Sequence, residues 1–167
     1  MRRYGLVVLA LVAAVGIGAC DDDEDDDDSN NYVASLTGAA ERPPVTTTAT
    51  GSFTLTDNGA SMAYVLTVNG VTGTVSGAHI HAIPRSGVAP ADTTGGIVVN
   101  LNPVAGVTTG ILAQGTITQA NIVGLGGAAA ISMDSLRTLM NAGRTYVNVH
   151  STPANPGGQI RGTIVRQ

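Results

Sequence analysis

The chain has 167 residues, a formal net charge of −4, a single cysteine, four tyrosines, one phenylalanine and no tryptophan. One cysteine excludes an intrachain disulfide. The few aromatic residues argue against binding of sugars or single-stranded nucleic acid by stacking, and the scattered arginines form no basic stripe, so we expect no nucleic-acid partner.

Residues 1–19 have the pattern of a secretory signal. A charged start at Arg2 and Arg3 precedes an uncharged apolar run that is shorter than the roughly 20 residues needed to span a bilayer. The run ends in Ile-Gly-Ala-Cys, which resembles a bacterial lipoprotein signal with Cys20 as the lipidated residue. The alternative is an ordinary cleaved signal followed by an incidental cysteine. We therefore expect an exported protein of the bacterial cell envelope, anchored to the membrane by a lipid on Cys20.

Residues 20–30 contain eight consecutive acids. Like charges at this density do not pack, so the segment is expected to be an extended tether, with a sorting signal or an ion-collecting tail as the alternative. From Ser29 onward the chain has six arginines, four acids and no lysine, a charge of +2. We expect residues 31–167 to form one domain, which is a common size.

Short apolar segments separated by turn signals predict an all-β domain. The clearest segment alternates apolar and other residues from Met62 to Val68, and the Asn58-Gly59 pair before it predicts a tight hairpin turn. We expect an antiparallel β-sandwich or Greek-key barrel of about eight strands. The expected strands are Tyr32–Leu36, Thr50–Thr56, Ser61–Val68, Ser76–Ile83, Gly96–Leu101, Ile111–Thr118, Thr145–His150 and Gln159–Val165.

One short helix is predicted at about residues 132–142. Ser132 is a suitable N-cap and Gly143 a suitable stop. The helical period places four apolar side chains on one stripe: Met133, Leu136, Leu139 and Met140. We expect this helix to be a structural lid on the sheet without catalytic residues.

All three histidines lie in two strand-like segments. Residues two apart on a strand share a face, so His79 and His81 lie together, opposite the small apolar residues between them. If the later strands lie beside this one, the polar faces form one cluster. Its members would be His79, His81, Tyr146, Asn148, His150, Gln159 and Arg161.

Two interpretations of the cluster compete, with acid–base chemistry as a third. In the first, the histidines and Arg161 form a structural hydrogen-bonded network, and no cofactor is present. In the second, His79, His81 and His150 bind a metal, and imidazole ligands suit zinc or copper. Two features count against the metal: no acid in these motifs orients the imidazoles, and Arg161 would add a positive charge beside a cation.

Four motifs, taken in order, resemble the CHRD domain, a module named after chordin. They are Ser-Gly-Ala-His-Ile-His at 76–81, Gly-Gly-Ile-Val-Val-Asn-Leu at 95–101, Gly-Arg-Thr-Tyr-Val-Asn-Val-His-Ser at 143–151 and Asn-Pro-Gly-Gly-Gln-Ile-Arg-Gly at 155–162. The resemblance extends from about Asn31 to Val165, and Ser151 stands where the family often has threonine. It implies an extracellular β-rich module without an established catalytic activity, present singly in bacterial envelope proteins.

No catalytic motif is recognisable: the domain has no cysteine nucleophile, no Gly-x-Ser-x-Gly and no His-Glu-x-x-His. We therefore expect a non-enzymatic, lipid-anchored binding or structural module with an unidentified envelope or extracellular ligand. The first alternative is a zinc- or copper-binding protein, with redox activity in the copper case. The second alternative is a hydrolase.

Overall fold

The computed structural model describes residues 30–83, 93–125 and 128–167. The expected signal sequence, Cys20 and nearly all of the acidic tether lie outside the described residues. The described part contains nine strands and one α-helix. The strands are β1 (Asn31–Thr37), β2 (Thr50–Asp57), β3 (Met62–Asn69), β4 (Thr74–Ala82), β5 (Gly96–Asn100), β6 (Gly110–Ile117), β7 (Thr145–Thr152), β8 (Asn155–Thr163) and β9 (Val165–Arg166).

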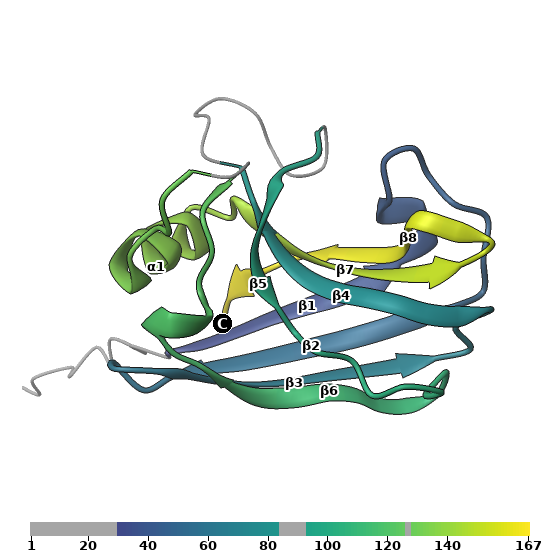
Figure 1. Cartoon of the computed structure of the whole chain (residues 1–167), viewed down its shortest axis with the longest axis horizontal. Helices are drawn as coiled ribbons and strands as arrows, with labels where there is room; N and C mark the ends of the chain where they lie inside the picture. Colours follow the sequence, from purple (N-terminus) through teal and green to yellow (C-terminus); the bar gives the residue numbers. More distant parts are fainter. Residues whose placement is uncertain (1–29, 84–92, 126–127) are drawn as a thin grey trace, which may run out of the picture.

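All the strand pairs are antiparallel and belong to one sheet with the order β5-β4-β7-β8-β1-β2-β3-β6, while β9 pairs with β1. The sheet curls into a half-barrel, so that β4, β7 and β8 lie above β1, β2, β3 and β6 in Figure 1. Beyond β6, the bridge between Ile122 and Val99 of β5 brings the two ends of the sheet together. The all-β, antiparallel prediction is confirmed.

The concave side of the curl holds the hydrophobic core. Its fully buried side chains come from both halves of the sheet, and they include Phe53, Leu55, Leu66, Ile80 and Ile160. The alternation predicted for β3 is confirmed, because Met62, Tyr64, Leu66 and Val68 are all buried. Aliphatic residues build most of this core, as the scarcity of aromatic residues requires.

The helix α1 (Met133–Asn141) lies at one end of the curl (Figure 1). As predicted, Ser132 is the N-cap and accepts a hydrogen bond from the Ser135 amide at 3.1 Å. Gly143 follows the helix with a φ of +61°, which suits glycine at a C-terminal stop. Met133, Leu136 and Met140 enter the core, and Leu139 packs against it. No helix in the described residues is long and apolar enough to cross a membrane.

The last hairpin differs from the expectation. The expected strand Gln159–Val165 starts earlier in the structure, because β8 begins at Asn155, which pairs with Ser151. The expected strand to Val165 is also divided, because β8 ends at Thr163 and β9 begins at Val165 on a different part of β1. The early start of β8 places the backbone of 155–158 beside the last residues of β7.

The β8 backbone approaches β1 very closely at Gly162. A Cβ at this position would lie 2.4 Å from the Ser35 carbonyl oxygen and 3.2 Å from the Leu36 amide nitrogen. Both atoms belong to the backbone of a paired strand, so they have little freedom to move. Gly162 therefore permits the junction between the two halves of the sheet.

We expect Gly162→Ala to lower the free energy of unfolding by about 2–3 kcal/mol, because the added methyl overpacks two backbones. Gly157→Ala is the matched control in the same strand, since nothing lies within 4 Å of a Cβ there. Chemical denaturation of both variants measures the difference. If Gly162→Ala and Gly157→Ala have the same free energy of unfolding, β1 and β8 can move apart at Gly162 without a loss of stability.

Candidate metal centre

Three adjacent strands place the predicted polar residues on one face. In the β4–β7 register, His79 pairs with Asn148, His81 with Tyr146 and Gly77 with His150. In the β7–β8 register, Asn148 pairs with Arg161. Cross-strand partners have Cβ atoms about 5 Å apart, so these side chains contact one another. The strand adjacency that the sequence left open is thus present.

The three imidazole rings converge. The ring centroids of His79 and His150 are 5.0 Å apart, those of His79 and His81 5.6 Å, and those of His81 and His150 6.2 Å. One nitrogen from each ring lies within 4.8 Å of the other two. Gly77 allows this arrangement, because a Cβ there would lie 2.8 Å from Cε1 of His79. The His79 ring leans over this glycine toward His150.

Backbone carbonyls orient two of the rings. Nδ1 of His81 lies 3.0 Å from the Gly95 oxygen, and Nδ1 of His150 lies 2.9 Å from the Pro156 oxygen. A carbonyl only accepts, so each Nδ1 carries the proton and, in the neutral ring, each Nε2 carries a lone pair. Both Nε2 atoms are buried without a hydrogen-bond partner, and so is Nδ1 of His79. This orientation by carbonyls is the usual support of histidine ligands.

Burial keeps two of the imidazoles neutral. It lowers the pKa of His81 to about 4, and the neighbouring histidines and Arg161 add to this effect against the Gly95 hydrogen bond. Burial, followed by the charge of His150, also lowers the pKa of His79. Neutral imidazole is the form that binds metal, so the rings of His79 and His81 need no deprotonation at neutral pH.

Tyr146 contacts both His81 and Arg161. Its ring stacks on His81 at a centroid distance of 4.8 Å and an interplanar angle of 5°, and the Arg161 guanidinium carbon lies 3.4 Å from the same centroid. The Tyr146 hydroxyl accepts the Gly95 N–H at 2.9 Å, and Arg161 donates to the Thr93 carbonyl at 2.7 Å. The cation–π contact engages the arginine charge that the sequence analysis counted against a metal.

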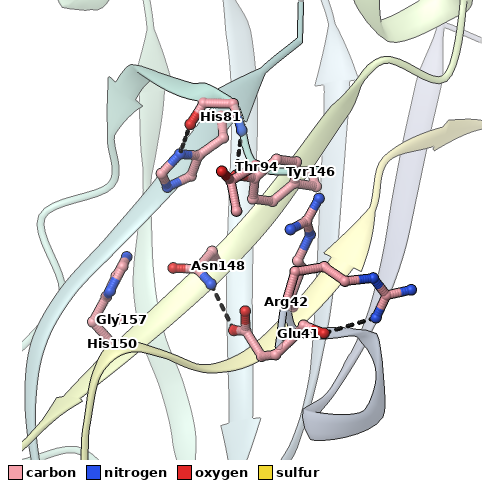
Figure 2. A pocket seen from close by; sticks show the side chains of 10 residues that line it. Glu41, Arg42, His81, Thr94, Tyr146, Asn148, His150 and Gly157 are labelled. Carbon is pink, nitrogen blue, oxygen red and sulfur yellow. Dashed lines mark hydrogen bonds between the residues drawn. The ribbon is translucent and has the colours of Figure 1, made fainter. Parts of the chain in front are cut away.

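Glu41, which the sequence analysis did not place here, joins the cluster from the connection between β1 and β2. Its Oε1 accepts a hydrogen bond from Asn148 Nδ2 at 2.6 Å, and Figure 2 shows Asn148 between Glu41 and His150. The residue is 4% exposed, and burial raises its carboxyl pKa to about 7 against the lowering effects of Arg161 and Arg42. The available signal was the Glu41-Arg42 pair, the only charged residues between positions 29 and 56, and Glu41 is 107 residues from Asn148.

Gln159 shares this face but has other partners. Its side chain accepts from the Thr72 amide at 3.2 Å and donates to the hydroxyls of Thr72 and Thr47. It ties the strands to a loop and does not line the cavity beside the histidines. Of the two acids in the second half of the chain, Asp134 pairs with Arg137 at 2.6 Å on the surface, and Asp92 lies outside the described residues.

Glu41 makes the stability depend on pH. The folded carboxyl keeps its proton up to about pH 7, whereas the unfolded one loses it near the usual value of 4.5, so the free energy of unfolding falls between these values. Glu41→Gln removes this effect. Between about pH 4.5 and 7.5 the wild type should therefore lose stability that the variant keeps. The free energy of unfolding of Glu41→Gln minus that of wild type should increase by about 1–2 kcal/mol over this range, after allowance for solvent screening.

Urea denaturation of the metal-free chain across this pH range tests the effect. Asp134→Asn, which removes an exposed acid in the same domain, is the control for the loss of one carboxyl group. A difference between wild type and Glu41→Gln that stays constant with pH would contradict the raised pKa of Glu41.

Comparison with known proteins supports the resemblance seen in the motifs. A search of curated proteins and a search of solved structures each found no match. The model of the CHRD domain family matches residues 32–164, which is most of the chain and contains every residue of the histidine cluster. The CHRD domain is not a known enzyme family. By this match, the chain belongs to the CHRD domain family.

Proposed function

We propose that this protein is a binding module of the cell envelope whose site holds one zinc or copper ion through His79, His81 and His150. The observation that carries the proposal is the set of three buried imidazole nitrogens, one per histidine, that have no hydrogen-bond partner. A buried polar atom without a partner costs roughly 1–3 kcal/mol. A metal ion would offset this cost at all three atoms.

The alternative of a purely structural network is weaker for the same reason. In such a network each ring would use both nitrogens, but His81 and His150 each use only Nδ1. Their Nε2 atoms, on the opposite side of each ring, are left for another ligand. The two backbone hydrogen bonds at Nδ1 agree with either interpretation, because they would also fix the ring orientation of a histidine that binds a metal through Nε2.

The distances require only a small adjustment. Zinc–nitrogen bonds of about 2.0–2.1 Å in tetrahedral geometry place the nitrogens about 3.3 Å apart. The ligand nitrogens lie within 4.8 Å of one another, so the rings would close by at most about 1.5 Å. Three neutral imidazoles suit zinc and copper, and they leave a fourth position open.

The location we propose is the bacterial cell envelope, with the domain held to a membrane by a lipid on Cys20. The support is the Ile-Gly-Ala-Cys sequence after a short apolar run, together with the acidic segment that follows. An extended tether of like charges would hold the domain away from an anionic lipid surface.

Metal binding is measured directly on the purified chain. We expect wild type to bind one more equivalent of copper(II) or zinc than the His79→Ala/His81→Ala variant, which keeps the acidic segment and so corrects for ions collected there. At a free-metal concentration of 100 times Kd, the bound ion should add about 2.7 kcal/mol to the stability of wild type alone. Equal stoichiometries for the two chains would exclude the histidine site.

The lipid anchor is tested in a bacterial host. Wild type should sediment with the membrane fraction, and Cys20→Ser should move to the soluble fraction, because the serine hydroxyl does not replace the thiol in lipoprotein processing. Ser29→Ala, which changes one residue after the acidic run, is the control and should remain with the membrane. A Cys20→Ser chain that still sediments with the membrane would contradict this location.

A further inference from the structure

A cavity of about 110 Å³ lies beside the histidine cluster. Two of the three histidines, His81 and His150, line it, together with other residues of β7 and residues from three further segments: 41–42, 94–95 and β8 (Figure 2). At ~30 Å³ per water in the liquid, the cavity has room for several waters or for a ligand of a few atoms. Because of this position, one molecule in the cavity can contact both a metal held by the histidines and the polar side chains on the opposite wall.

One wall of the cavity presents a hydrogen-bond acceptor without a donor. Asn148 is 3% exposed and lines the cavity, and its Oδ1 is buried without a partner. The amide cannot turn freely, because its Nδ2 donates to Glu41 Oε1 at 2.6 Å. Oε1 of Glu41 is the acceptor in this hydrogen bond, so Glu41 holds the amide nitrogen toward itself and leaves the amide oxygen for another molecule. A ligand here needs an O–H or N–H group.

The charges around the cavity favour an anion. Arg42 and Arg161 both line it, and Glu41 is the single acid in its lining. Among the residues that line the cavity there are thus two guanidinium groups and one carboxyl. A divalent ion on the histidines would add two more positive charges. The field in this small space therefore selects negative ligands.

We propose that the cavity binds a small monoanionic oxyacid that retains one O–H group. The O–H donates to Asn148 Oδ1, and an anionic oxygen faces the open position of the metal. Glu41 is a positioning residue, because it acts only through the orientation of the Asn148 amide. This inference rests on the metal site proposed above.

Bicarbonate and nitrate form a matched pair of probes. Both are planar anions with one negative charge and three oxygens, but only bicarbonate carries an O–H. The full chain is loaded with less than one equivalent of copper(II) at pH 8, and each anion is titrated while the visible spectrum of the copper is followed. The His79→Ala/His81→Ala variant, treated in the same way, corrects for copper on the acidic segment.

Bicarbonate is the more basic anion and the better copper ligand by itself, so the hydrogen bond is read from the change in the bicarbonate-to-nitrate affinity ratio between variants. Asn148→Ala should lower this ratio about tenfold relative to wild type, the difference expected for one hydrogen bond to a buried acceptor, while the copper stoichiometry stays the same. Glu41→Ala should also reduce the ratio, since the amide is then free to turn. Glu41→Gln should restore it, because the amide oxygen of glutamine still accepts from Asn148 Nδ2.

The outcomes separate the two proposals. If wild type binds no stoichiometric copper beyond the histidine variant, both the metal site and the anion site are wrong. If copper binds stoichiometrically but bicarbonate and nitrate bind equally, or neither changes the spectrum, only the anion site is wrong. A bicarbonate-to-nitrate affinity ratio that neither Asn148→Ala nor Glu41→Ala lowers would also overturn the assignment of Asn148 as the acceptor.

Discussion

Much of the polar face of β4, β7 and β8 is buried, although the apolar face on the other side of the same strands is the hydrophobic core. Tyr146, Asn148 and Arg161 are each no more than 3% exposed, although none of them faces the hydrophobic core. Buried polar groups need partners, so this second face has to be assembled from complementary groups. The stacking of Arg161 on Tyr146 and the hydrogen bond from the Asn148 amide nitrogen to Glu41 satisfy part of this requirement, and the Asn148 amide oxygen stays without a partner.

The histidines are the place where the second face is incomplete. Burial lowers the pKa of His79 and His81 and keeps these rings neutral, while the carbonyls of Gly95 and Pro156 fix two protons on Nδ1. The same packing that stabilises the strands thus leaves one nitrogen of each ring buried without a hydrogen-bond partner, and one nitrogen from each ring lies within 4.8 Å of the other two. The metal site proposed above rests on this arrangement.

The connections between strands supply hydrogen-bond partners for the polar side chains on the strands. Residues 38–49 bring Glu41, and residues 93–95 bring the carbonyls and the amide that engage His81, Tyr146 and Arg161. Glycine is required where these segments approach most closely: a Cβ on Gly158 would lie 2.6 Å from Glu41 Oε1. The chemistry of the site therefore depends on loop placement as much as on the sheet.

The sequence by itself determined the antiparallel β class, most strand positions, the capped helix and the shared face of His79 and His81, because these follow from local periodicity and turn chemistry. The order of strands, the convergence of His150 on that pair, and the role of Glu41 were decided only by the tertiary structure. They depend on contacts between residues as far apart as Glu41 and Asn148, which are separated by 107 positions. Local patterns carry no information about such pairings, because many strand orders bury the same alternating residues equally well.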